Sequence, residues 1–204
     1  MRSSSFQLNT CDRILSYHVR PNGGESPNFT GQLLVAHPSL RDPNFRRTIL
    51  FLSTHDPDEG AHGLVINRPT NKNLGEFLPD QELEKLRNVP VYLGGPVGTQ
   101  ELTIVSFQLD PGDSKMTFHS PGSLESLEEF KEDELGTLRA FVGYAGWTSG
   151  QLEFELEQSA WLIIPATEEI LREQAGDKVW LELMKELGPA YYVLAMAPDD
   201  PSLN

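Results

Sequence analysis

Short apolar segments that recur along the chain are the feature that most constrains its fold. From Gly31 onward these segments are rich in Leu, Ile and Val, and turn-forming residues separate each one from the next. Runs of this length and composition predict β-strands, because branched and aromatic side chains pack well on a pleated surface. We expect about nine strands, over residues 31–37, 47–54, 62–68, 89–95, 101–108, 115–120, 138–146, 161–166 and 191–196.

Segments with a helical spacing of apolar residues lie mainly in the second half of the chain. The clearest covers residues 177–189, where Trp180, Leu183 and Leu187 share one face and Asp177 is the expected N-cap. Early strands followed by late helices predict an α+β fold: a single domain with a mixed, largely antiparallel β-sheet and helices concentrated in the C-terminal half. Shorter helices are expected over residues 73–88, 123–136 and 149–160 and after Thr167.

The length of 204 residues fits one domain, and a hydrophobic content of 38% is sufficient for a buried core. Residues 20–28 contain a cluster of Pro, Gly, Asn and Ser that is typical of a linker. We therefore predict an N-terminal extension and linker over residues 1–28 and a single domain over residues 29–204.

The chain is acidic, and its charge is unevenly distributed. The formal net charge is −14, and residues 120–204 carry 5 Lys and Arg against 17 Asp and Glu. A field of this sign repels phosphate groups, so we expect neither direct nucleic-acid binding nor membrane association. Residues 1–119 are nearly balanced, with 11 Lys and Arg against 13 Asp and Glu, so an anionic ligand is expected in this half. Its basic residues include Arg41, Arg46, Arg47, Arg68 and Lys72.

Cysteine content and hydropathy exclude some kinds of site and indicate the cell compartment of the protein. Cys11 is the only cysteine, which excludes an intrachain disulfide and a Cys-based zinc site. No apolar run approaches the roughly 18 residues of a membrane span, and the first residues lack the apolar core of a signal peptide. We therefore expect a cytoplasmic protein.

The segment HDPDEGAH, residues 55–62, is the one dense group of potential metal ligands in the sequence. His55, Asp58 and His62 could together gather a divalent cation. The proline and glycine between them are typical of a tight turn, however. We expect an exposed acidic turn here, and neither a metal nor a cofactor.

The stretch FVGYAGWTSGQLEFELEQ, residues 141–158, places glycines between an expected strand and an expected helix. No Lys follows these glycines and their spacing is wrong for a dinucleotide-binding loop, so both phosphate-binding motifs are excluded. The G-x-T-x-G pattern around Thr148 resembles a nucleophile elbow, but all five His residues precede it, whereas an elbow needs a downstream His. We expect a tight corner anchored by Trp147, with Ser149 as helix cap; the alternative is an anion bound at this helix N-terminus.

A second glycine pair, Gly94 and Gly95, follows the expected strand over residues 89–95 and precedes a proline. Such a pair is typical of a structural strand exit. The alternative is a nest of outward-facing backbone amides that binds an anion.

Polar residues near two other prolines form a third candidate group. Arg68 ends an expected strand and precedes Pro69, which presents the guanidinium rigidly. Asp42 and Asn44 flank a proline and are expected to form an Asx-type turn. Two interpretations stay open: an Asp–Arg network that joins two loops, or a ligand site.

Four ordered motifs, D-P-N-F, G-L-V-I-N-R-P-T, Y-L-G-G-P-V and G-Y-A-G-W…G-Q-L-E, resemble those of the bacterial YqgE/AlgH family. The resemblance runs from about Gly31 to about Gly188. It implies one α+β domain with a mixed sheet. The family is largely uncharacterised: some members carry a provisional label as transcriptional regulators, from an association with alginate production, and there are no established catalytic residues to transfer.

Specific polar and glycine motifs without a nucleophile–base pair predict a non-catalytic regulatory protein that binds a small anion or a protein partner. One alternative is an enzyme of the hydrolase or nucleotide-handling type that uses Arg68 and the glycine turns electrostatically. Another is a transcriptional regulator, although the acidic charge disfavours direct DNA binding. We assign no catalytic residue. The positions expected to line a shared ligand surface are Asp42, Asn44, Asn67, Arg68, Gly94, Gly95, Gly143, Gly146, Trp147 and Gln151.

Overall fold

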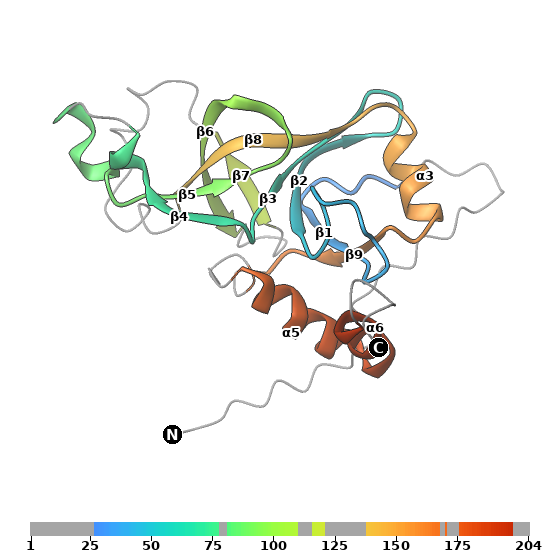
Figure 1. Ribbon diagram of the computed structural model, residues 1–204. Helices are drawn as coiled ribbons and strands as arrows, with labels where there is room; N and C mark the ends of the chain where they lie inside the picture. The colour runs from blue at the N-terminus through green and yellow to red at the C-terminus, as the bar shows by residue number, and fades with distance from the viewer. Residues whose placement is uncertain are drawn as a thin grey trace.

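The structure, a computed structural model, describes residues 27–77, 81–109, 116–120, 138–167, 170 and 176–197. Within these residues, strands dominate the first part of the chain and the α-helices follow β8 (Figure 1). In chain order the elements are β1 (Gln32–Ala36), β2 (Ile49–Asp56), β3 (Gly60–Val65), β4 (Pro69–Asn73), η2 (Leu74–Glu76), η3 (Gln81–Leu86), β5 (Pro90–Leu93), β6 (Val97–Leu109), β7 (Met116–His119), β8 (Leu138–Trp147), α3 (Gln151–Glu157), β9 (Trp161–Pro165), α5 (Asp177–Leu187) and α6 (Pro189–Met196), where η marks a 3-10 helix.

The nine strands of the described residues form one mixed sheet in the order β4-β5-β8-β3-β2-β1-β9, with β6 paired to β8 and to β7. The β5–β8 pair is parallel and the other pairs are antiparallel. The first half of β8 pairs with β5 and β6, and its last three residues pair with β3. This long strand therefore joins the two parts of the sheet, as Figure 1 shows. The predicted α+β fold with a mixed, largely antiparallel sheet is confirmed.

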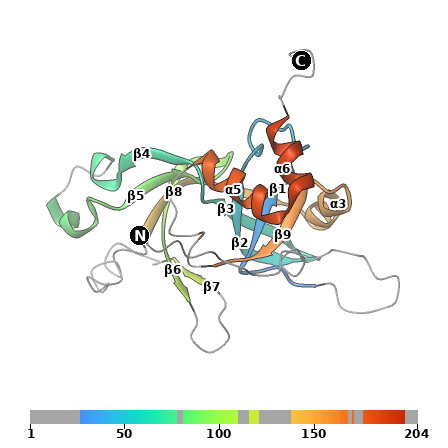
Figure 2. The same cartoon turned by 90° about the horizontal axis from the view of Figure 1, so that it is seen from below.

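Alternating side chains on the strands build a core on each face of the sheet. In β1, Leu33 and Val35 belong to the cluster that contains α5, whereas Leu34 and Ala36 belong to the cluster that contains α3. Figure 2 shows α5 and α6 lying across the first of these faces. Trp180 ties α5 to the sheet, because its indole N–H donates to the Ala36 carbonyl at 2.8 Å. Burial of two faces explains why these strands are nearly continuous apolar runs.

A third cluster lies at the end of the sheet formed by β5, β6 and β8. Leu74 and Leu86 of the 3-10 helices pack there on Val91, Ile104 and side chains of β8. The helical segment expected over residues 73–88 is thus present as two short 3-10 helices.

The prediction of a last strand over residues 191–196 is wrong, because Pro189–Met196 is the helix α6. Gly188, at φ 129°, ends α5, and Pro189 occupies the first position of α6. Proline favours this position, since its φ already suits a helix and its missing N–H is not needed there. A short apolar run fits a strand or a helix equally well by pattern, so the flanking Gly-Pro decided the outcome.

Three local predictions also differ from the structure. β3 ends at Val65, so Arg68 does not end a strand but lies just before β4, an edge strand that the sequence did not indicate. Gly150, at φ 71°, is the N-cap of α3, and the Ser149 hydroxyl donates instead to the Pro57 carbonyl at 3.0 Å. The N-cap of α5 is likewise a glycine, and the acidic residue expected there is the first helical residue.

The helix predicted over residues 123–136 and most of the predicted extension over residues 1–28 lie outside the described residues. Of the helix predicted after Thr167, Ile170 is described: it is helical, and its N–H donates to the Thr167 hydroxyl at 3.5 Å. No helix in the described part of the chain has the length and apolar content to cross a membrane.

Candidate functional site

The loop between β1 and β2, residues 37–48, carries the first motif and has a well-defined turn. Asp42 Oδ1 accepts a hydrogen bond from the Asn44 N–H at 2.7 Å. The Asp42 carbonyl accepts from the N–H groups of Phe45 and Arg46, at 3.0 and 2.8 Å. The predicted Asx-type turn is therefore confirmed. Asp42 and Asn44 are exposed, whereas Phe45 is partly buried.

Asn67, just after β3, holds the end of this loop. Its side chain is buried, its Oδ1 accepts from the Ile49 N–H, and its Nδ2 donates to the Arg47 carbonyl, both at 2.9 Å. Arg47 has a left-handed φ of 56°, a conformation that costs a residue with a Cβ about 1–2 kcal/mol. The amide of Asn67 offsets part of that cost by fixing the backbone on both sides of Thr48.

Arg68 connects loop 37–48 to the turn before β4. Its Nη1 donates to the Asn44 carbonyl at 2.6 Å, and its Nη2 donates to the carbonyls of Arg46 and Pro43 at 3.2 and 3.5 Å. Partial burial lowers the pKa of Arg68, and the negative charge of Asp177 opposes this shift. The acceptors are backbone carbonyls rather than the Asp42 carboxylate, so the fork fixes the course of the loop.

Phe45 attaches the same loop to the glycine corner through aromatic contacts. Its ring stacks on Trp147 with centroids 6.4 Å apart and meets Trp161 edge-on at 5.6 Å. The two tryptophans contact each other at 6.1 Å, nearly perpendicular. Stacked and edge-on pairs at these separations stabilise beyond the area that they bury. Trp147 thus anchors the corner, as the sequence predicted, by packing against Phe45 of the D-P-N-F motif.

Glu155 of α3 completes this aromatic group, although its role was not evident in the sequence. The indole N–H groups of Trp147 and Trp161 both donate to Glu155 Oε2, at 2.9 and 2.8 Å. Gln151 Nε2 donates to Glu155 Oε1 at 3.0 Å. One carboxylate therefore satisfies two buried indoles and one amide. In the sequence, Glu155 is visible only as a Glu that lies eight residues after Trp147, on the helix that follows. This pattern is too common to identify a functional residue.

Gln151 and Thr148 close the turn that precedes α3. Gln151 Oε1 accepts from the Thr148 N–H at 3.2 Å and from the Thr148 hydroxyl at 3.3 Å. The hydroxyl that a nucleophile elbow would use therefore points to Gln151, inside the turn.

Gly94, Gly95 and Gly143 are required because two backbone segments pass very close to each other. A Cβ on Gly94 would overlap the Gly143 carbonyl, and a Cβ on Gly95 would overlap the Tyr144 backbone. Gly143 is at φ 70°, and a Cβ there would lie 2.5 Å from the Gly95 carbonyl oxygen. The Gly94 N–H already donates to the Val142 carbonyl at 2.8 Å. Backbone of β8 thus occupies the space that a bound anion would need at this pair.

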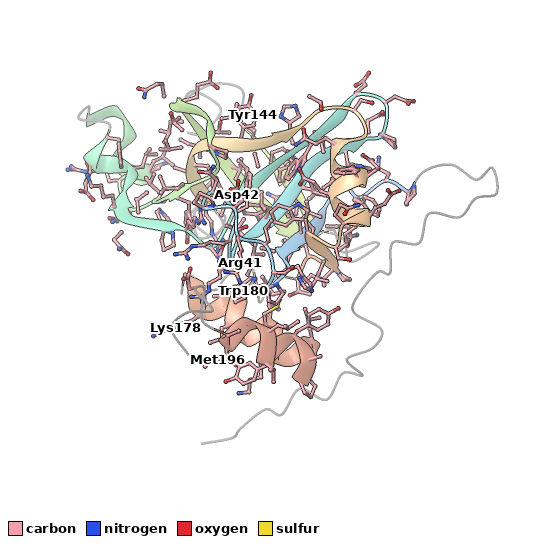
Figure 3. All side chains as sticks on the ribbon, turned by 45° about the vertical axis from the view of Figure 1, so that its right-hand side comes forward. Arg41, Asp42, Tyr144, Lys178, Trp180 and Met196 are labelled. Carbon is pink, nitrogen blue, oxygen red and sulfur yellow. The ribbon has the colours of Figure 1, made fainter. Side chains whose placement is uncertain are left out.

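Loop 37–48 brings several of the predicted positions into one region. It contacts Arg68 through its carbonyls and Trp147 through Phe45. Leu93, directly before the pair Gly94 and Gly95, donates its N–H to the Arg68 carbonyl at 2.9 Å. Gly146 is separate from this group, because it pairs with His62 between β3 and β8. In Figure 3, Arg41 lies close to Trp180 of α5, with Asp42 above it in this view, whereas Tyr144 lies at the top of the molecule.

His55 is buried and both of its ring nitrogens are occupied. Its Nδ1 accepts from the Phe29 N–H at 3.2 Å, so the proton is on Nε2, which lies 2.8 Å from Glu153 Oε1. Asp56 Oδ1 accepts from the N–H groups of residues 58 and 59 and closes the turn after β2. Among the described residues, no group of three His, Cys, Asp or Glu side chains could hold a metal ion.

A pair of buried polar side chains lies elsewhere on the sheet: Arg139, which the sequence analysis did not single out, and Tyr92, the first residue of the Y-L-G-G-P-V motif. Arg139 of β8 is 7% exposed and Tyr92 of β5 is fully buried. The Arg139 guanidinium lies 5.3 Å from the centre of the Tyr92 ring and 5.8 Å from that of Phe107. Within the structure as described, neither Arg139 Nη1 nor the Tyr92 hydroxyl has a hydrogen-bond partner. Burial lowers the pKa of Arg139 and raises that of Tyr92, as expected for charged forms removed from water.

Comparison with known proteins gives a consistent match over most of the chain. The model of the AlgH-like family, DUF179, matches residues 33–192. A UPF0301 protein of Thermobifida fusca is 33% identical and covers 87% of this chain and 96% of its own. A UPF0301 protein of Streptomyces coelicolor is 36% identical, with coverage of 88% and 97%.

Two solved structures have similar folds. The solution structure of the AlgH protein from Pseudomonas aeruginosa is 30% identical, with a TM-score of 0.59, over 88% of this chain and all of its own. The crystal structure of protein DIP2367 from Corynebacterium diphtheriae has a TM-score of 0.66 over 86% of this chain and 95% of its own. At 21% identity, this second likeness shows the fold alone.

Proposed function

We propose that this chain, which belongs to the AlgH-like family, is a non-catalytic binding protein that presents loop 37–48 to a protein partner. The observation that carries the proposal is the Arg68 fork on the carbonyls of Pro43, Asn44 and Arg46. The fork holds the exposed residues 41–44 in one conformation before any partner arrives. A preformed loop loses little conformational entropy on binding, which favours affinity.

The charge of the loop indicates the chemistry of the partner. Arg41 and Arg46 are exposed on a protein whose formal net charge is −14. A small basic area on an acidic protein attracts a complementary acidic segment and repels basic ones. An acidic segment of a partner protein therefore matches this surface best.

Photo-crosslinking in the native host tests the proposal. A photoreactive residue at exposed Asn44 is compared with one at exposed Glu182 on α5, and the products are identified by mass spectrometry. We expect a discrete product from position 44 only. The identified partner, once purified, should bind the wild type but not the Arg41→Glu, Arg46→Glu double variant, while Lys178→Glu retains binding. Equal product patterns at positions 44 and 182 would refute the proposal.

A further inference from the structure

Arg139 Nη1 and the Tyr92 hydroxyl are buried and have no hydrogen-bond partner among the described residues. Arg139 and Phe141 lie two apart on β8, so they share a face, and Phe141 is paired with Tyr92 on β5. Val105 of β6 lies directly opposite Arg139. The parallel β5–β8 pairing and the antiparallel β6–β8 pairing therefore bring a guanidinium, a phenol and several apolar groups to one place.

An arginine in such a place requires a partner. Arg139 is the only Lys, Arg, Asp or Glu that is buried among the described residues. Buried charges in proteins are normally paired, because the hydration lost on burial is not recovered otherwise. The faces of the Tyr92 and Phe107 rings offset part of that loss through cation–π contact, but they accept no conventional hydrogen bond from Nη1.

The Tyr92 hydroxyl adds a second, independent indication. Buried phenol groups usually find a hydrogen-bond partner, and this one has none in the part of the chain that the structure describes. The missing partner of both groups would accept hydrogen bonds and would carry negative charge. A carboxylate does both, and its planar shape matches the guanidinium fork.

The surroundings limit the rest of the ligand. Phe51, Phe107 and Phe141 form a chain of ring contacts beside the guanidinium, with centroids 5.2 and 6.3 Å apart. Such surroundings suit an apolar tail. They do not suit a phosphate dianion, whose second charge would have no cation to balance it among the buried described residues. We propose that Arg139 and Tyr92 bind the carboxylate of a small apolar monoanion, such as an aromatic or short aliphatic acid.

Titration with sodium benzoate and sodium hexanoate, followed by calorimetry and by thermal unfolding, tests this site. Sodium chloride at equal ionic strength controls for salt, inorganic phosphate tests the second anion class, and benzyl alcohol tests the apolar tail without the charge. We expect at least one of the two acids to raise the Tm of the wild type above the salt control, and phosphate and benzyl alcohol to leave it unchanged.

Two variants and one matched control assign the effect to the pair. Arg139→Met should weaken acid binding by about 10- to 100-fold, since it removes a charge-assisted hydrogen bond from a desolvated site. Tyr92→Phe should weaken it less, by about 3- to 10-fold. Arg68→Met removes an arginine that is engaged with loop 37–48 and should bind the acids as the wild type does. The Tm of Arg139→Met without ligand should be unchanged or higher. This result would show that the variant is folded and that its weaker acid binding is not caused by unfolding.

Three results would overturn the site: no stabilisation by either acid beyond salt, unchanged acid affinity in Arg139→Met, or stronger stabilisation by phosphate than by the acids. The crosslinking at position 44 uses other residues and another readout, so either proposal can fail without the other.

Discussion

Around loop 37–48 the Arg68 guanidinium reaches three backbone carbonyls, and the Glu155 carboxylate receives two indole N–H groups and one amide. At the other region, the buried pair Arg139 and Tyr92, the guanidinium meets two ring faces, and Nη1 and the phenol hydroxyl have no partner in the described structure. The first region contains most of the residues expected to line a ligand surface, whereas the second contains only one residue from the motifs, Tyr92, which begins Y-L-G-G-P-V. The motif residues in the first region hold a loop in place. The two buried groups without a described partner in the second region mark the place where we expect another molecule to bind.

The strongest test of the first region compares two glycines with the same backbone conformation. Gly143 and Gly150 have φ of 70° and 71°, but a Cβ on Gly143 would meet two carbonyl oxygens at 2.5 and 2.7 Å, whereas a Cβ on Gly150 would meet nothing within 4 Å. Gly143→Ala should therefore cost about 3 kcal/mol or more, and Gly150→Ala about 1 kcal/mol. Urea unfolding of the two variants measures both values. Equal losses in the free energy of unfolding would show that both positions require glycine for its backbone conformation, and that close packing adds nothing at Gly143.

A second test breaks the aromatic part of that region at Glu155. Glu155→Leu leaves two buried indole N–H groups without an acceptor and should lower the free energy of unfolding by about 2–3 kcal/mol. Glu155→Gln keeps an oxygen for the indoles and should cost about 1 kcal/mol. Chemical denaturation followed by tryptophan fluorescence reports on stability and on the indoles at once. If Leu were tolerated as well as Gln, the carboxylate would not be the group that holds this corner.

The same substitution at two arginines tests the comparison directly. Arg68→Met deprives three carbonyls of their donor and should lower the free energy of unfolding by about 1–2 kcal/mol. Arg139→Met replaces a buried guanidinium, whose Nη1 has no hydrogen-bond partner among the described residues, by an apolar side chain and should leave stability unchanged or raise it by about 1 kcal/mol. Paired urea denaturation curves at pH 7 give both differences. Destabilisation by Arg139→Met as large as that by Arg68→Met would remove the distinction between the two regions.

The smallest expected effect lies at the start of loop 37–48 and depends on pH. His37 Nδ1 accepts from the Ser39 N–H at 3.2 Å, and burial lowers the His37 pKa below its usual value near 6.5. Because the folded state favours the neutral ring, the stabilisation is present above pH 6.5 and is lost as the pH falls through the lowered pKa. Wild-type Tm should decrease more between pH 7.5 and 5.5 than that of His37→Gln. Identical decreases would show that the ring does not couple to folding.

Much of the fold was predictable because strand signals are local. Eight of the expected strands correspond to β1 to β3 and β5 to β9, since each is a short apolar run between turn residues. β4 escaped prediction because its sequence, PTNKN, is polar and begins with proline, which is tolerated at the edge position that the strand occupies. The run at 191–196 was assigned to the wrong class because its pattern carries no period, and the preceding Gly-Pro was the better signal.

The site was predictable only in its components. The sequence indicated Arg68, Trp147 and Gln151, but not that Phe45 would connect them or that Glu155 would accept from two indoles. Arg139 stands in an apolar run, LRAFVGYAGW, where a single basic residue is unremarkable. Arg139 matters because its buried Nη1 has no hydrogen-bond partner among the described residues. The sequence alone does not show whether a donor is paired, because its partners depend on the tertiary structure.

By itself, the sequence determined the class of the fold, most of the strands and the family. Those properties depend on hydrophobic period and turn chemistry, which act over a few residues. Only the tertiary structure decided which polar groups meet. Arg68 finds its acceptor 24 residues away and Trp180 finds one 144 residues away, so each pairing depends on how strands are ordered in the sheet. The same ordering places Arg139 beside the rings of Tyr92 and Phe107, and within the described residues its Nη1 has no hydrogen-bond partner.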